Sequence, residues 1–100
     1  MKIYISGKIT GIEEEAYKLF EIAENKLKLQ GYDVVVNPMK LPHNHDKSWE
    51  AYMRECIVAL MSCDTIYILS NYYMSKGAFL EIALAKELGI GVIYEEYYLK

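Results

Sequence analysis

The chain has 100 residues and a formal net charge of −3 at pH 7, with 53% hydrophobic and 25% charged residues. This balance excludes a disordered chain and predicts one globular domain over residues 1–100. The negative charge argues against a general nucleic-acid-binding protein. No apolar run approaches the roughly 20 residues that a membrane-spanning helix needs.

The cysteines and the N-terminal residues predict the compartment. Cys56 and Cys63 are seven residues apart on one predicted helix, about two turns from each other, and cannot form a disulfide. The first residues show no apolar signal-peptide core and no small-residue cleavage site. We therefore expect reduced thiols and a cytoplasmic protein.

The first third of the chain alternates between strand and helix patterns. Lys2–Ser6 is rich in β-forming residues and predicts a strand that ends at Gly7. Tyr32–Val36 predicts a second strand, which Asn37-Pro38 ends. Between them a helix is predicted over Glu13–Gln30, because apolar residues recur on one face: Ala16, Leu19, Phe20, Ala23 and Leu27.

The rest of the chain repeats this alternation after a long loop over residues 37–47. The predicted elements are a helix from the cap Ser48 to Ser62, a strand over Thr65–Leu69, a helix from the cap Ser75 to Leu88, and a strand over Gly91–Tyr94. This order predicts an α/β fold, a flavodoxin-like (Rossmann-like) three-layer sandwich with a small four-stranded parallel sheet. In such a sheet ligands bind beyond the carboxyl ends of the strands, here between loops 7–11 and 70–77.

One acidic residue, Glu81, falls on the buried face of the last helix. Ala78, Ala85 and Leu88 lie within about 60° of it on a helical wheel. A carboxylate in that stripe is unfavourable unless it is paired. Tyr4, inside the first strand, needs a hydrogen-bond partner that such a carboxylate supplies. Glu81 is therefore either a structural acid bonded to a tyrosine or to backbone, or a functional carboxylate in the crevice.

The start of the same helix suits an anion. Ser75 caps it, Gly77 lets a ligand approach the backbone, and the first amides of a helix lack internal acceptors. The alternative is an ordinary capped helix. The loop Ser6–Gly11 has neither P-loop spacing nor a G-x-G-x-x-G pattern, so no dinucleotide site is predicted.

Three further features have less specific interpretations. His43, His45 and Asp46 suggest a metal site, but their spacing fits no structural zinc pattern, so we expect a polar rim without metal. Asp64 precedes a strand, which excludes a receiver-type phosphorylation site. Aromatic residues near the C-terminus, with Phe79, favour a subunit contact, and we expect a homo-oligomer.

Several short motifs follow one another along the chain: Ile3-Tyr4-Ile5-Ser6-Gly7-Lys8-Ile9-Thr10-Gly11, Asn37-Pro38, Leu41-Pro42-His43-x-His45-Asp46, Ser48-Trp49-Glu50-x-Tyr52-Met53-Arg54, Cys63-Asp64 and Ser75-x-Gly77-Ala78-x-x-Glu81-x-x-x-Ala85. In this order and spacing they resemble the nucleoside 2-deoxyribosyltransferase-like superfamily and, within it, the DUF4406 family. The resemblance covers nearly the whole chain.

This resemblance implies cleavage or transfer at the N-glycosidic bond of 2′-deoxynucleosides or their 5′-monophosphates. It implies that Glu81 is the nucleophile and that Tyr4 holds its carboxylate. The chemistry is that of a retaining glycosidase, for which we expect no cofactor. The expected partner is a small nucleoside or nucleotide. The substrate-binding positions we assign are Ser6, Gly7, Lys8, Ile9, Ser75, Gly77 and Cys56.

The chain departs from the family pattern at the second acid. The family places that acid eight residues before the aspartate that starts the third strand, and counting back from Asp64 gives Cys56. A thiol is a poor general acid, and Cys56 also fits as a small core residue. Superfamily transferases also carry a C-terminal extension, whereas this sequence ends at Lys100. Two functions stay open: the N-glycosidase or transferase, and a non-catalytic nucleotide-binding or scaffold module.

Overall fold

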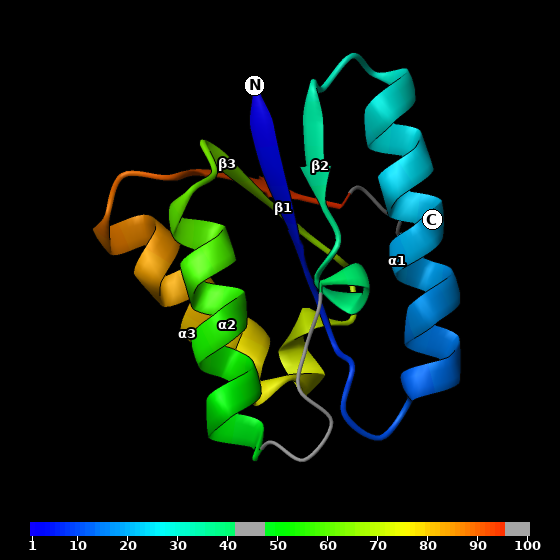
Figure 1. Ribbon diagram of the computed structural model, residues 1–100, viewed down its shortest axis with the longest axis vertical. Coiled ribbons are helices and arrows are strands. Elements are labelled where there is room, and N and C mark those ends of the chain that lie inside the picture. The colour runs from blue at the N-terminus through cyan, green and yellow to red at the C-terminus, as the bar shows by residue number, and fades with distance from the viewer. Residues whose placement is uncertain (42–47, 96–100) are drawn as a thin grey trace, which may run out of the picture.

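The computed structural model describes residues 1–41 and 48–95 (Figure 1). Its sheet contains four parallel strands in the order β2-β1-β3-β4, namely β1 Lys2–Ser6, β2 Val34–Val36, β3 Thr65–Ile68 and β4 Gly91–Tyr94. The helices are α1 Glu13–Leu29, α2 Trp49–Met61 and α3 Lys76–Glu87. Two short 3-10 helices, η1 Pro38–Lys40 and η2 Tyr72–Met74, follow β2 and β3. The predicted flavodoxin-like α/β fold is confirmed.

The helices cover the two faces of the sheet separately, α1 on one side and α2 with α3 on the other (Figure 1). Phe20 and Leu27 of α1 pack with Ile3 and Ile5 of β1. Because successive strand residues point to opposite faces, Tyr4 lies in the other core. That second core contains Tyr4, Cys56, Leu60, Cys63, Ile66, Ile68, Ile82 and Ala85.

Both predicted serine caps are present. The Ser48 hydroxyl accepts a hydrogen bond from the Ala51 amide at 3.2 Å, and Ser75 accepts one from the Ala78 amide at 3.0 Å. Each side chain satisfies a donor that the first turn of a helix leaves open. These caps fix where α2 and α3 begin, which places both helix starts at the carboxyl edge of the sheet.

Some element ends differ from prediction. β2 begins at Val34 rather than Tyr32, because the Tyr32 amide bonds back to the carbonyl of Leu27 and so closes the end of α1. Leu88 does not join the buried stripe around Glu81. It is the C-cap residue of α3 and is 58% exposed. The helical-wheel prediction made the buried stripe too long, because it assumed that the helix continues through Leu88.

Cys56 and Cys63 are both buried and both free, as expected. Cys56 lies on α2, whereas Cys63 lies beyond the end of that helix rather than on it, because α2 ends at Met61 with Ser62 as its C-cap. Among the described helices, none is long and apolar enough to span a bilayer.

Candidate functional site

A cavity of about 510 Å³ opens where β1 and β3 lie side by side and the strand order reverses. Its walls come from the loop after β1 and from the first turns of α2 and α3. This is the crevice that the strand pattern predicts. The assigned positions that line it are Tyr4, Ser6, Gly7, Lys8, Ile9, Cys56, Ser75, Gly77 and Glu81.

Glu81 is the buried acid of this cavity and is 5% exposed. The Tyr4 hydroxyl donates a hydrogen bond to its Oε2 at 2.7 Å, and the Ser6 hydroxyl donates one to its Oε1 at 2.6 Å. Both donors come from β1, so the strand fixes the orientation of the carboxyl group. Burial raises the pKa of Glu81 to about 7, although the bonds from Ser6 and Tyr4 act to lower it. The carboxyl is therefore close to half-ionised at neutral pH.

Cys56 lies beside this carboxyl group on α2. Burial, and then the negative charge of Glu81, raises the pKa of the Cys56 thiol to about 11, against the effect of hydrogen bonds with Tyr4 and Tyr52. Burial also raises the pKa of Tyr4 and of Tyr52 above the usual tyrosine value. Among these four side chains, Glu81 alone changes its charge near neutral pH.

The N-terminus of α3 forms a second functional wall. The Ser75 hydroxyl accepts from the Ala78 amide, and its own proton remains available to a ligand. The amides of Lys76 and Gly77 have no acceptor within the helix, and both residues line the cavity. This arrangement favours a bound anion because amide donors and the positive end of the helix dipole coincide.

Lys8 and Lys76 both line the cavity. The Lys8 ammonium donates to the Met74 carbonyl at 3.2 Å, and the Lys8 amide donates to Asn71 Oδ1 at 3.1 Å. These bonds tie the loop after β1 to η2. The Lys76 ammonium lies 4.4 Å from the centre of the Trp49 ring, which joins the starts of α3 and α2 by a cation–π contact.

Four lining residues of α2 were not assigned to the site from the sequence, namely Trp49, Glu50, Tyr52 and Met53. The pattern did contain a signal for Trp49, Tyr52 and Met53, because they share a helix face with Cys56, which we assigned. The helical pattern shows that a face is buried, but it does not show which part of that face meets a cavity.

Gly7 and Gly77 permit close approaches in the cavity wall. A Cβ atom on Gly7 would lie 2.9 Å from Leu69 Cβ, and one on Gly77 would lie 3.0 Å from Met53 Sδ. Methionine can move its sulfur, whereas the Cβ of Leu69 is fixed by the backbone. Gly7 is therefore the more constrained position.

Gly7→Ala is expected to destabilise the protein by about 1–3 kcal/mol, because the added methyl group overlaps Leu69. Thermal unfolding followed by circular dichroism measures the effect. Gly91→Ala is the matched control, since its Cβ would meet Thr65 Oγ1 at an ordinary 3.4 Å. Equal melting temperatures for the two variants would contradict the close packing at Gly7.

The predicted polar rim at His43, His45 and Asp46 lies outside the described residues. Within residues 1–41 and 48–95, no group of at least three His, Cys, Asp or Glu side chains is placed to hold a metal ion.

The fold is similar to that of a solved 2-deoxyribosyltransferase from the psychrotolerant bacterium Bacillus psychrosaccharolyticus. The TM-score is 0.75 and the identity is 21%, over 100% of this chain and 77% of that chain. This likeness defines the structural class, the α/β fold of the 2-deoxyribosyltransferases. Within it, the family described as a domain of unknown function, DUF4406, matches residues 1–94, and the chain belongs to that family. No curated protein matches the chain.

Proposed function

We propose that the protein is an N-glycosidase or deoxyribosyltransferase acting on 2′-deoxynucleosides or their 5′-monophosphates, with Glu81 as the nucleophile. The supporting observation is the buried Glu81 carboxyl group, whose two oxygens accept hydrogen bonds from Tyr4 and Ser6 beside the cavity. A carboxylate oriented in this way meets the needs of a retaining glycosidase. The similar fold described above is that of a 2-deoxyribosyltransferase.

The reaction has two steps at the anomeric carbon of the deoxyribose. A Glu81 oxygen attacks this carbon, the bond to the base nitrogen breaks, and its electron pair stays with the base, which takes up a proton from solvent. Water or a nitrogen of a second base then attacks the same carbon, loses a proton to solvent, and displaces Glu81 as a carboxylate. Tyr4 and Ser6 orient the attacking group and stabilise its charge when it is released.

The start of α3 suits the 5′-phosphate of a monophosphate substrate. The Ser75 hydroxyl and the amides of Lys76 and Gly77 supply donors, and the Lys8 ammonium adds positive charge to the same cavity. Glu81 lies farther along the same helix, so one ligand can present its phosphate to the helix start and its sugar to the carboxylate. We therefore expect monophosphates to be preferred over free nucleosides.

The thiol of Cys56 favours a second function. Its pKa of about 11 makes it a weak proton donor to a departing base. A chain without an effective second acid would bind a nucleotide but would not cleave it. The alternative is therefore a non-catalytic nucleotide-binding or scaffold module.

Chromatographic measurement of free-base release from a panel of 2′-deoxynucleosides and their 5′-monophosphates tests both functions. The enzyme predicts release by the wild type and its loss in Glu81→Ala. The module predicts deoxynucleotide binding in a thermal-shift assay without release, and a gain of release in Cys56→Asp. Equal release by wild type and Glu81→Ala overturns the enzyme. A substantial wild-type rate that Cys56→Asp leaves unchanged overturns the module.

Self-association and a cytoplasmic location remain predictions. Phe79 is 52% exposed, and its ring centre lies 5.8 Å from that of Tyr72, which in turn lies 5.4 Å from that of Tyr94. An exposed aromatic cluster of this kind supports a subunit contact. Two free, buried cysteines fit a reducing compartment.

A further inference from the structure

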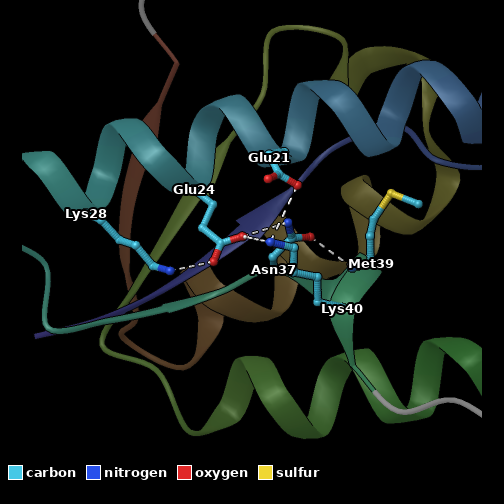
Figure 2. A network of polar contacts seen from close by, with 6 residues as sticks. All are labelled: Glu21, Glu24, Lys28, Asn37, Met39 and Lys40. Carbon is cyan, nitrogen blue, oxygen red and sulfur yellow. Dashed lines mark hydrogen bonds and ion pairs between the residues drawn. The ribbon is translucent and has the colours of Figure 1, made fainter.

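A second buried acid, Glu24, lies on α1 outside the cavity and is 6% exposed (Figure 2). Asn37 Nδ2 donates to its Oε1 at 3.1 Å, and the Lys40 ammonium lies 3.0 Å from the same oxygen. The Lys28 ammonium lies 2.8 Å from Oε2. Burial acts to raise the pKa of Glu24, but the bonds from Lys28, Lys40 and Asn37 outweigh it and lower the pKa to about 2. Glu24 is therefore a buried anion at neutral pH.

Two of these contacts lead to a single turn of the chain, the corner between β2 and η1. Asn37 follows β2, and its Oδ1 accepts from the Met39 amide at 3.0 Å, which closes the first turn of η1. Lys40 ends η1. Figure 2 shows both side chains converging on Glu24 from this corner. The Glu24 carboxylate therefore contacts both ends of this corner, Asn37 at its start and Lys40 at its end.

Pro38 lies between these two anchors. It is fully buried and lines the cavity that contains Glu81. The corner that Glu24 holds is therefore also part of the cavity wall, and η1 packs against β1, the strand that carries Tyr4 and Ser6. A shift of this corner would change the shape of the cavity, whereas the hydrogen bonds that hold the Glu81 carboxyl group come from Tyr4 and Ser6 and not from the corner.

The lowered pKa of Glu24 means that its contacts stabilise the folded chain at neutral pH. The side chains of Lys40 and Lys28 are 43% and 57% exposed, so solvent screens part of their attraction to the carboxylate. A polar network whose members are all hydrogen-bonded also fixes one geometry. The geometry that Glu24 fixes is that of the β2–η1 corner.

We propose that Glu24 is a positioning residue of the cavity: through Asn37 and Lys40 it fixes Pro38 in the cavity wall and so sets the space in which the nucleoside binds. The inference rests on the proposed function, because that function supplies the nucleoside. Glu24 therefore acts on substrate binding, and Glu81 acts on bond cleavage.

Glu24→Gln and Lys40→Gln test the proposal, with Lys28→Gln as the matched control. The control removes a charged partner of the same carboxylate but does not touch the corner. In Glu24→Gln we expect KM for a 2′-deoxynucleoside 5′-monophosphate to rise about tenfold and kcat to change by less than about twofold. The midpoint of the pH–rate profile stays near 7, because Glu81 keeps its surroundings. Lys28→Gln keeps the wild-type KM.

Hydrogen exchange at the Met39 amide separates this inference from the proposed function, because it needs no substrate. We expect exchange to be about tenfold faster in Glu24→Gln and Lys40→Gln than in Lys28→Gln. Lys40 is 43% exposed, so its variant covers the case in which Glu24→Gln fails to fold. Unchanged exchange overturns the inference, and so does faster exchange with an unchanged KM.

A wild type that releases no base refutes the proposed enzyme and leaves the positioning role open to test. The Kd for the monophosphate, followed by the fluorescence of Trp49, the single tryptophan, then replaces KM. A tenfold weaker Kd in Glu24→Gln supports the inference, by the same loss of a charged hydrogen bond. A wild-type chain that neither releases base nor binds the monophosphate overturns both proposals.

Discussion

Glu81→Gln is expected to lower kcat/KM for base release by at least about 10³-fold. The amide preserves the size of the side chain and accepts hydrogen bonds, but it cannot attack the anomeric carbon as a carboxylate does. Chromatographic base release from 2′-deoxynucleoside 5′-monophosphates at pH 8 measures the loss. At that pH most of the wild-type carboxyl is ionised, since its pKa is about 7. The wild-type rate should rise with pH through this value.

Glu87→Gln is the matched control for this prediction. Glu87 is the last residue of α3 and is exposed, so the same chemical change occurs away from the cavity. This variant should keep the wild-type rate. A Glu81→Gln rate within about tenfold of the wild type would contradict the role of the carboxylate as nucleophile.

Glu81→Gln should also stabilise the fold at pH 8. The pKa of Glu81 is about 7 in the folded chain, against an ordinary value of 4.5. Between these values the folded state holds more protons than the unfolded state, so the free energy of unfolding falls as pH rises. The total loss is about 3 kcal/mol and is complete above pH 7. Glutamine carries no charge, so the variant does not lose this unfolding free energy as the pH rises.

Thermal melts of wild type and Glu81→Gln at pH 5 and pH 8 measure this effect. We expect the variant to melt about 12–24 °C higher at pH 8 and near the wild-type temperature at pH 5. Glu24 does not disturb the comparison, because its lowered pKa affects stability only when the pH falls below 4.5 toward 2. An equal difference in melting temperature at pH 5 and at pH 8 would contradict the coupling between Glu81 ionisation and stability.

Much of the fold and part of the site could be predicted from the sequence. The alternation of strand and helix periodicity defines the parallel sheet, and the helical wheel places Glu81 in a buried stripe. Tyr4 needed a polar partner in the core, and the partner is Glu81, 77 residues away. These features are local patterns combined with one topological rule, that β1 and β3 meet at the reversal of strand order.

The Glu24 network could not be predicted in the same way. Glu24 adjoins the apolar stripe of α1, but its partners Asn37 and Lys40 come from a 3-10 turn that hydrophobic periodicity does not signal. The contact between Ser6 and Glu81 was also not predicted. We assigned Ser6 to substrate binding, whereas its hydroxyl donates a hydrogen bond to the Glu81 carboxyl group. Side-chain contacts between elements depend on distances that no single-sequence pattern contains.

Mass spectrometry of the wild type, mixed with a 2′-deoxynucleoside 5′-monophosphate and quenched in acid, tests the central claim most directly. We expect part of the protein to carry one 5′-phosphodeoxyribosyl group, located on the peptide that contains Glu81, and we expect Glu81→Gln to carry none. Base release without an adduct on Glu81, or an equal adduct in Glu81→Gln, would contradict the proposal that this carboxylate is the nucleophile.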